Sequence, residues 1–460
     1  MIERLKLANV GPAQEMELEF APRLNVFTGD NGLGKSFILD IAWWSLTRTW
    51  PAEIGHKLTT GLKAFPYSDR KNEAAIEALL LDDSQKKFGF ASKYNHHIQG
   101  WDSKWEPQSW KIKNPGDPKR PGLAIYVMSD GSFAVQDYHR NPIYWPWQIP
   151  KKAEEQGPFA AMKDLATMTS ATAFVFNAHE VWNGLDAGDI SGERWILCNG
   201  LIRDWAGWQK ERGEPFEYLK SVLKELSPPN HPPIVPGKLT RVSLGDVRDM
   251  PTVKMPYGQE IALVHASSGL KHILALAYLL VWTWHEHKIA AELRGEETAS
   301  SITFLIDEIE SHMHPSWQRK IVGSMLKVAK ILNEDIDVQI IATTHAPLVM
   351  ASIEPLFDDR QDAWFDLDLE DSEVVLSRRE FEKQGDANNW LTSEAFDLSS
   401  PVSEEAQIVI KEARMLLDKK DTATADEVWA VHKKLAKTLP YDSDFLSTWR
   451  YFWKKQGYMQ

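Results

Sequence analysis

The sequence contains a single cysteine, Cys198, in 460 residues. One thiol excludes an internal disulfide framework and is typical of a protein kept in a reducing compartment. The run from Arg194 to Cys198 is mostly apolar and suggests a helix. We therefore expect Cys198 to be a packed thiol rather than a reactive one.

Long hydrophobic runs are also missing. The longest, Ile273 to Trp284, is shorter than the roughly 20 residues that a bilayer-spanning helix needs, and it predicts a core helix instead. The opening residues, MIERLKLANV, alternate as a strand does and lack the apolar core of a signal peptide. We therefore expect a cytoplasmic protein without a membrane partner.

Basic residues are too few for a general nucleic-acid binder. Lysine and arginine number 52 against 65 aspartates and glutamates, so the formal net charge is −13. A local basic groove is still compatible with this balance. Its best candidate is a tryptophan-bearing surface loop over residues 100–121, which carries Lys111, Lys113, Lys119 and Arg120.

What the chain does contain is a phosphate-binding loop. In such a loop, backbone N–H groups surround phosphates, a lysine reaches the β- and γ-phosphates and a hydroxyl binds Mg²⁺. Residues 24–27 predict a buried strand before it, and residues 37–47 predict an apolar helix whose N-terminus faces the anion. The loop fits G-x-x-x-x-G-K-[ST] and reads Gly29, Asp30, Asn31, Gly32, Leu33, Gly34, Lys35, Ser36.

Two further predicted strands end in polar residues. Residues 302–306 predict an all-buried strand that ends in Asp307 and Glu308, where an open α/β sheet binds ligands. We expect Asp307 to hold Mg²⁺ and Glu308 to act as the general base on water. A strand over 338–343 leads to His345, which can reach a γ-phosphate. Taken alone, the carboxylates suit a solvated turn equally well, and a lone histidine is more often structural.

The remaining patterns divide the chain into four parts. Residues 2–20 predict a β-hairpin, and 74–81, 88–94, 123–128, 133–138, 171–177, 239–242 and 260–264 predict strands. Residues 190–226, 271–288 and 314–332 predict helices. We expect an N-terminal lobe over 1–180, a helical segment with a proline-rich linker over 181–237, a second lobe over 238–400 and a helical region over 401–460.

The order of these motifs resembles a known family, the ATP-binding-cassette ATPases. There too a phosphate loop precedes a signature at the start of a helix, a carboxylate pair and a switch histidine. The resemblance is closest to the branch of RecF, SMC and OLD-type ATPases, because of the asparagine-glycine loop, the Ser-Ser-Gly signature and residues 310–315 (ESHMHP). It covers most of residues 1–350. It implies an α/β ABC-ATPase head with a mixed central sheet flanked by helices, an N-terminal antiparallel β lobe and a short C-terminal helical region.

The resemblance also implies a role for each motif. ATP would join two copies of the chain, because the signature of one copy would complete the nucleotide site of the other. The implied ATP ligands are residues 29–36 with Ser267, Ser268 and Gly269, and the implied Mg²⁺ ligands are Ser36 and Asp307. Glu308 would be the catalytic base and His345 the γ-phosphate switch. His312 and Pro315 would lie in the loop that crosses the interface between the two copies.

Several features depart from the family pattern. The signature, residues 266–271 (ASSGLK), differs from LSGGQ and favours slow hydrolysis, with ATP occupancy as the alternative signal. The glutamine loop has two candidates at predicted strand ends, Gln136 and Asn177. His312 and His314 could suggest a metal site, but no carboxylate–histidine triad surrounds them, so we do not expect one.

The long coiled-coil arms of SMC proteins and the Toprim nuclease of OLD proteins have no room in this sequence. The acidic residues 366–368 and 370–371 are therefore expected to be solvated turns. The aromatic cluster of Trp449, Phe452 and Trp453 suits either contact with a partner or another copy, or an apolar face folded back on the ATPase core.

We expect an ATPase that dimerises or oligomerises on ATP and scaffolds or controls a partner nuclease encoded by a neighbouring gene. In this respect the chain resembles the ATPase components of two-gene anti-phage systems of the Septu and PARIS type. The alternative is a RecF-like ATPase of DNA repair that clamps DNA through the basic loop. Of the functions considered, that of a transporter's ATP-binding subunit agrees least with the sequence.

Overall fold

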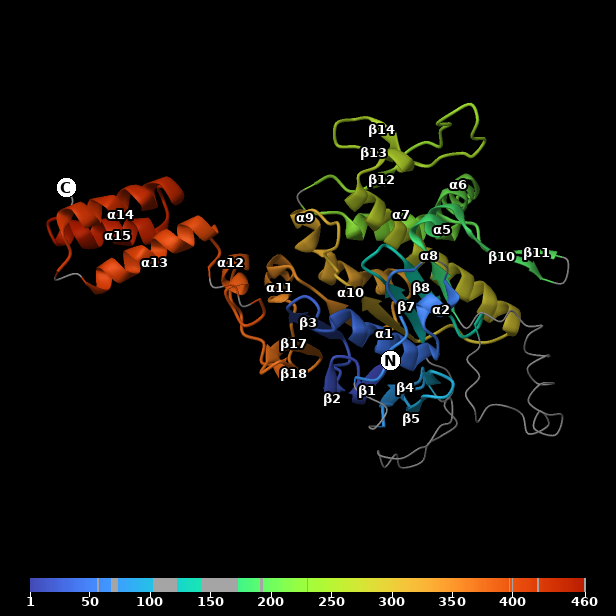
Figure 1. The fold of residues 1–460 in the computed structure, drawn as a ribbon. Helices are drawn as coiled ribbons and strands as arrows, with labels where there is room; N and C mark the ends of the chain where they lie inside the picture. The colour runs from blue at the N-terminus through green and yellow to red at the C-terminus, as the bar shows by residue number, and fades with distance from the viewer. Residues whose placement is uncertain are drawn as a thin grey trace. The chain divides into compact units, whose positions relative to one another are not determined.

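The computed structural model describes residues 1–55, 58–67, 73–101, 122–141, 173–190, 193–229, 231–396, 398, 400–419 and 422–458. These residues form two compact units, 1–387 and 388–460 (Figure 1). The finer division into four segments stays a prediction. Within the described ranges, every helix is too short or too polar to cross a membrane.

An eight-stranded mixed sheet forms the centre of the first unit, in the order β18-β17-β3-β16-β15-β7-β8-β9. The strands from β17 to β7 are parallel, whereas β18 and β8 run against their neighbours and β9 runs against β8. All six residues of β15 are buried, as expected for a parallel strand covered on both faces. The strands are β3 (Leu24–Gly29), β7 (Leu123–Val127), β8 (Phe133–Gln136), β9 (Phe174–Phe176), β15 (Ser301–Ile306), β16 (Asp337–Thr343), β17 (Asp362–Glu370) and β18 (Glu373–Arg379).

The predicted N-terminal hairpin is confirmed and belongs to a five-stranded antiparallel sheet. Leu5 lies opposite Leu18 and Leu7 opposite Met16, and all four are buried, whereas the glutamates between them are exposed. The strands, in the order β2-β1-β4-β5-β6, are β1 (Ile2–Val10), β2 (Ala13–Glu19), β4 (Ala75–Leu81), β5 (Lys87–Asn95) and β6 (Gly100–Trp101).

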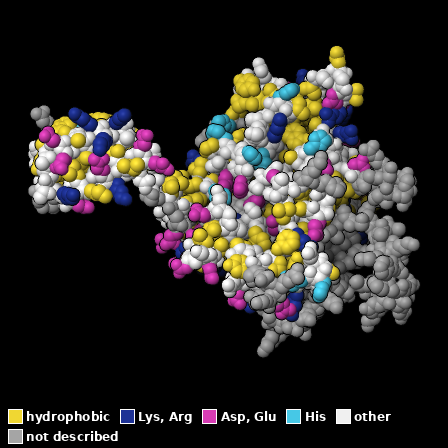
Figure 2. All heavy atoms as spheres, viewed as in Figure 1, with side chains coloured by type: hydrophobic (Ala, Val, Ile, Leu, Met, Phe, Trp, Pro, Cys, Tyr) yellow, Lys and Arg dark blue, Asp and Glu magenta, His cyan; other side chains and the backbone are white. Residues whose placement is uncertain are grey.

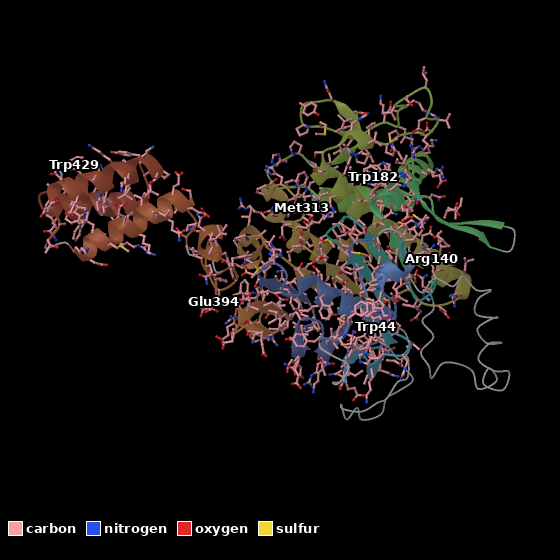
Figure 3. All side chains as sticks on the ribbon, in the orientation of Figure 1. Trp44, Arg140, Trp182, Met313, Glu394 and Trp429 are labelled. Carbon is pink, nitrogen blue, oxygen red and sulfur yellow. The ribbon has the colours of Figure 1, made fainter. Side chains whose placement is uncertain are left out.

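Helix α1 (Lys35–Thr47) lies between the two sheets, in contact with β1 on one side and with β3, β7, β15 and β16 on the other. The core around it includes residues of both sheets. Trp44 of α1 stacks on Trp50 with ring centres 5.5 Å apart and lies 6.0 Å from Trp101 (Figure 3). Several tryptophans of this sequence are therefore core residues of this layer. The short helix α2 (Pro51–Ile54) follows.

Helix α8 (Ser268–Arg294) is the main helix of the other layer and contacts α5, α6, α7 and α10. Its Trp282 meets Phe174 and Phe176 of β9 edge to face. The helices of this layer are α5 (Ala178–Asn183), α6 (Leu201–Glu211), α7 (Glu214–Leu226), α9 (Pro315–Gln318), α10 (Ile321–Leu332) and α11 (Pro347–Ile353). The expected α/β architecture is thus confirmed: a mixed sheet flanked by helices, an antiparallel N-terminal sheet and C-terminal helices.

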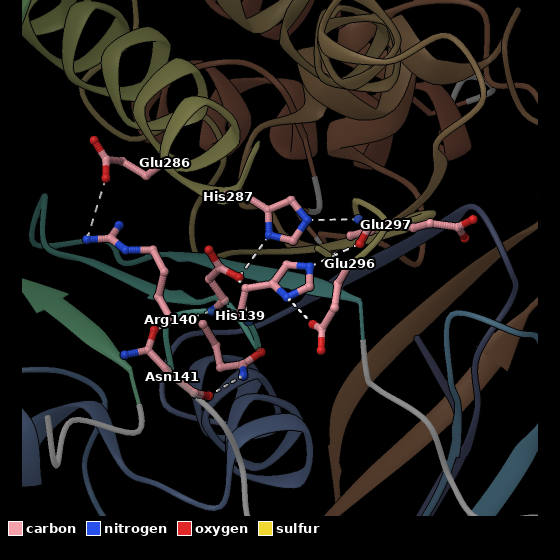
Figure 4. A network of polar contacts seen from close by, with 10 residues as sticks. His139, Arg140, Asn141, Glu286, His287, Glu296 and Glu297 are labelled. Carbon is pink, nitrogen blue, oxygen red and sulfur yellow. Dashed lines mark hydrogen bonds and ion pairs between the residues drawn. The ribbon is translucent and has the colours of Figure 1, made fainter. Parts of the chain in front are cut away.

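A buried polar network ties α8 to the sheet (Figure 4). His287 of α8 bonds the Asp137 carboxylate through Nδ1 at 2.8 Å, and its Nε2 accepts the Ala299 N–H at 2.8 Å. These partners fix a neutral ring with its proton on Nδ1. His139 contacts the Glu296 carboxylate and the Glu297 carbonyl, so the network also holds the segment that leads into β15.

Two small sheets project from this unit. One pairs β10 (Leu185–Ile190) with β11 (Glu193–Cys198), and the other consists of β12 (Val235–Pro236), β13 (Thr252–Lys254) and β14 (Glu260–Ala262). The loop between β12 and β13 exposes Leu244 and Val247, and yellow hydrophobic side chains are visible there in Figure 2.

The second unit has a hydrophobic core of its own. Helices α13 (Glu404–Asp418), α14 (Ala425–Thr438) and α15 (Asp444–Lys455) surround it, and α12 (Ala387–Leu391) precedes them. Trp449 and Trp453 are 1% and 0% exposed inside this core. They are therefore core residues of this unit, whereas the sequence predicted a surface for another protein, for another copy or for the ATPase core. Trp429 on α14 is 43% exposed (Figure 3).

Three predictions of local structure are wrong. Residues 193–198 form strand β11 and not a helix, because the short apolar run pairs with β10. Residues 239–242 form no strand; a single bridge joins Thr240 to Met250. Residues 366–368 are not a solvated turn but part of β17, where Asp366 is fully buried and accepts a hydrogen bond from the Thr28 hydroxyl at 2.6 Å.

Candidate nucleotide-binding site

The phosphate loop joins β3 to α1, as predicted, and its glycines are structurally required. Gly34 has a φ of 103°, and a Cβ there would lie 2.7 Å from the Pro12 ring. Gly29 has a φ of 115°, and a Cβ would lie 2.2 Å from the Leu367 carbonyl oxygen of β17. Only glycine fits these two positions. No side chain caps the N-terminus of α1, so its N–H groups face the loop and can bind an anion.

Lys35 folds over the loop. Its Nζ donates to the carbonyl oxygens of Gly29 and Asp30, each at 2.7 Å. Burial lowers the pKa of Lys35 to about 8, although the carboxylates of Asp30 and Asp307 oppose this shift. The ammonium group is therefore still mostly charged at neutral pH and available to a phosphate.

Ser36, Asp307 and Thr343 meet at the end of the central strands. Ile306 of β15 is level with Ala342 of β16, so both strands end at the same edge of the sheet. One oxygen of Asp307 accepts hydrogen bonds from the Ser36 hydroxyl at 2.9 Å and from the Thr343 hydroxyl at 2.8 Å. The other oxygen, Oδ2, is buried and has no hydrogen-bond partner among the described residues. A hydroxyl and a carboxylate oxygen of this kind fit a divalent cation.

Glu308 and His345 flank this group. The Glu308 N–H donates to the Thr343 hydroxyl at 2.7 Å, and its φ of 47° turns the residue away from the strand direction. Among the described residues, no hydrogen bond or ion pair involves the Glu308 carboxylate or the His345 ring. Burial and the charge of Lys35 lower the pKa of His345, so the imidazole is neutral at pH 7.

Three residues around this group were not predicted from the motifs: Thr343, Asp40 and Tyr126. Thr343 bridges the two strand ends, as described above. Asp40, one turn after Ser36 on α1, accepts a hydrogen bond from the Tyr126 hydroxyl of β7 at 2.9 Å. Burial raises the pKa of Asp40 to about 8, and the charge of Asp307 adds to this. The spacing of Asp40 and Ser36 on one helix face was the available signal for this residue.

The signature residues Ser267, Ser268 and Gly269 lie at the start of α8. Ser267 caps α8 by accepting the Leu270 N–H at 3.4 Å. A Cβ on Gly269 would lie 2.7 Å from the His312 carbonyl oxygen, so α8 starts against the segment after Glu308. No hydrogen bond among the described residues joins Ser267, Ser268 or Gly269 to residues 29–36.

The two candidates for the glutamine loop lie at opposite edges of the sheet. The carboxylate edge is marked by Ile306, the last residue of β15, which is level with Val127 of β7. Phe133 of β8 pairs with Val127 at this edge, whereas Gln136 pairs with Ala124 toward the other end of β7. Gln136 is therefore at the wrong edge, and it is buried. Asn177 follows Phe176, which pairs with Phe133, and so lies at the carboxylate edge; there it caps α5. The basic residues Lys111, Lys113, Lys119 and Arg120 lie outside the described residues.

Two family descriptions match the chain. Residues 4–101 match an AAA domain, and residues 152–351 match an AAA domain described as putative AbiEii toxin, Type IV TA system. The two matches include the phosphate loop, the signature, Asp307, Glu308 and His345. Both lie within the first unit.

A curated relative is similar over a short stretch. The retron Ec83 probable ATPase of Escherichia coli is 28% identical over 136 residues, which are 29% of this chain and 21% of that protein. The chain thus matches about a fifth of the length of this relative.

Solved structures are similar at low levels. The SMC head domain from Thermotoga maritima is 13% identical and has a TM-score of 0.39, with 82% of this chain and 99% of that chain covered. The recombination mediator protein RecF-ATPrS in the RecFOR pathway is 14% identical with a TM-score of 0.34, covering 82% and 98%. Likeness at these scores carries no argument about function.

Proposed function

We propose that this chain, which carries AAA-family ATPase domains, is an ATPase. It binds ATP at residues 29–36 and hydrolyses it to ADP and phosphate. The observation that best supports this is the Ser36–Asp307–Thr343 group beside the phosphate loop. A buried oxygen of Asp307 there lacks a partner within the part of the chain that the structure describes. Such an oxygen is costly unless it has a partner, and a cation is a suitable one.

Each side chain has a part in the proposed reaction. Lys35 and the N–H groups of α1 would bind the phosphates. Ser36 and Asp307 would hold Mg²⁺, which would supply positive charge to stabilise the phosphate oxygens. The Glu308 carboxylate, for which the described residues supply no hydrogen bond or ion pair, can take the proton of the attacking water. The neutral His345 ring contacts the γ-phosphate.

We further propose that ATP joins two copies of the chain through Ser267, Ser268 and Gly269. These residues start α8, a helix whose N-terminal N–H groups suit an anion, yet no hydrogen bond in the described ranges joins them to the phosphate loop of their own chain. In our proposal the assembled form controls a partner nuclease in anti-phage defence; a short stretch of the chain is similar to a retron ATPase. The alternative, a RecF-like ATPase that acts on DNA, rests on the basic loop alone.

The test compares mass by light scattering, and ATP binding by calorimetry, for the wild type and three variants. Glu308→Gln should bind ATP, fail to hydrolyse it and accumulate as a dimer or larger form. Lys35→Ala should lose ATP binding. Glu334→Gln is the matched control, because Glu334 is an exposed acid at the opposite edge of the sheet.

Each arm has an outcome against the proposal. Unchanged mass with ATP for both the wild type and Glu308→Gln rules out ATP-dependent assembly. Intact binding by Lys35→Ala rules out the site. Salt-dependent binding of duplex DNA that stimulates hydrolysis, without binding of the neighbouring gene's product, favours the DNA-handling alternative.

A further inference from the structure

Glu310 is a carboxylate that the proposed reaction does not yet use. It follows Glu308 by two residues in the turn after β15 and is half-buried. Its Oε2 accepts a hydrogen bond from the Thr344 hydroxyl at 2.7 Å, and its Oε1 accepts one from the His345 N–H at 2.6 Å. Both donors belong to the irregular connection between β16 and α11. One side chain therefore holds two successive residues of that connection.

The backbone N–H groups of this connection each have a different acceptor. Thr344 N–H donates to the Phe27 carbonyl of β3 at 2.9 Å, and Ala346 N–H donates to the Thr344 hydroxyl at 3.1 Å. The N–H of His345 is the one that depends on Glu310. A partly buried N–H that loses its acceptor is costly, so the backbone at His345 would move without the carboxylate.

The same two segments are joined residue by residue. Thr343 bonds Asp307 and the Glu308 N–H through its hydroxyl, and the Ile309 N–H through its carbonyl at 3.1 Å. Glu310 extends this series by one step, to Thr344 and His345. The carboxylate edge and the switch histidine are thereby one cross-linked unit.

We propose that Glu310 is a positioning residue that fixes the backbone of His345 and so aims its imidazole at the γ-phosphate. The inference rests on the proposed function, because it assigns Glu310 to the same reaction. Glu310 itself touches no reacting atom. Its effect passes through His345.

The kinetic test is a double-mutant cycle. We expect Glu310→Ala to lower kcat roughly ten- to a hundredfold, as small misplacements of catalytic groups do, and to change the KM for ATP by less than about threefold. Glu310→Gln should recover part of kcat, because its amide oxygen can still accept the His345 N–H. Thr344→Val removes the other hydrogen bond and should cost less than Glu310→Ala.

The cycle is completed with His345→Ala. In that background Glu310→Ala should lower kcat by no more than about twofold further, because the residue acts through His345. Independent, multiplying effects of the two substitutions would overturn the inference. So would a loss that falls on KM alone.

A second readout does not need hydrolysis. In the full chain with labelled histidine rings, the NMR cross-peak absent from His345→Ala identifies the His345 ring. This peak should move in Glu310→Ala and stay nearly in place in Thr344→Val. An unmoved peak in Glu310→Ala contradicts the inference even if the protein is an ATPase. Failure of Lys35→Ala to reduce ATP binding contradicts the proposed function instead, and the ring peak still decides the role of Glu310.

Discussion

Asp40 is an acidic side chain on the phosphate-loop helix whose protonation state the fold controls. It accepts the Tyr126 hydroxyl at 2.9 Å, and burial raises its pKa to about 8, well above the 3.8 of a free side chain. Between these two values the folded state holds a proton that the unfolded state has released. Stability therefore falls as pH rises from about 4 to 8 on account of this residue.

Replacing Asp40 with asparagine should remove that cost. The asparagine side chain keeps an oxygen for the Tyr126 hydroxyl and cannot ionise. We expect Asp40→Asn to be more stable than the wild type at pH 8 by roughly 1–3 kcal/mol, and to gain much less at pH 5. Urea unfolding at both pH values measures this. The exposed Asp335→Asn is the control, and an Asp40→Asn gain that is equal at both pH values contradicts the titration of Asp40.

Single residues were predictable from sequence where the chain itself brings them together. The strand, loop and helix around residues 24–47 follow from a contiguous motif, and the carboxylate pair follows from the end of a buried strand. Asp366 could not be predicted, because its partner Thr28 is distant in sequence and the register of β17 on β3 brings the two together. Without that register, an acid between apolar residues looks like a turn.

At the scale of elements, α8 depends on the polar network beneath it. His287 is fully buried, and both of its ring nitrogens are used, by the Asp137 carboxylate and by the Ala299 N–H. A leucine of similar size would leave the Ala299 N–H without its acceptor and would remove one of the two donors to the Asp137 carboxylate, whose Oδ1 also accepts the His139 N–H at 2.9 Å. Each such loss costs about 1–3 kcal/mol.

We therefore expect His287→Leu to lower the free energy of unfolding by about 2–4 kcal/mol. The matched control is His285→Leu on the same helix, where a half-buried ring meets Trp208 edge to face and the change should stay within about 1 kcal/mol. Chemical denaturation of the two variants measures the difference. Equal losses would mean that the network does not anchor α8.

Elements were predicted well where length and alternation decide, and poorly for short apolar runs. The alternation of Leu5, Leu7, Met16 and Leu18 fixed the N-terminal hairpin, because only one register buries all four. The apolar side chains of residues 193–198 are compatible with a helix as well as with a strand. Their pairing with residues 185–190 depends on a turn that periodicity does not reveal.

At the scale of the whole molecule, the chain has two units that each contain a hydrophobic core. The first is built around α1 and its two sheets, and the second around Trp449 and Trp453. Aromatic residues near the end of a sequence are compatible with a partner surface, a domain contact or a local core. The packing of α13, α14 and α15 on one another shows that they form a local core. The periodicity of the sequence does not distinguish this arrangement from a partner surface or a domain contact.

The separate cores predict separate unfolding. Trp453→Ala should create a cavity in the second unit and lower its free energy of unfolding by roughly 3–5 kcal/mol, while the first unit keeps its transition and the chain keeps its affinity for ATP. Calorimetry of the full chain, with and without ATP, resolves the two transitions because ATP raises only that of the first unit. Tyr451→Ala, at a side chain 71% exposed on the same helix, is the control and should shift neither. If Trp453→Ala shifts both transitions together, the two units unfold as one and their cores are energetically coupled.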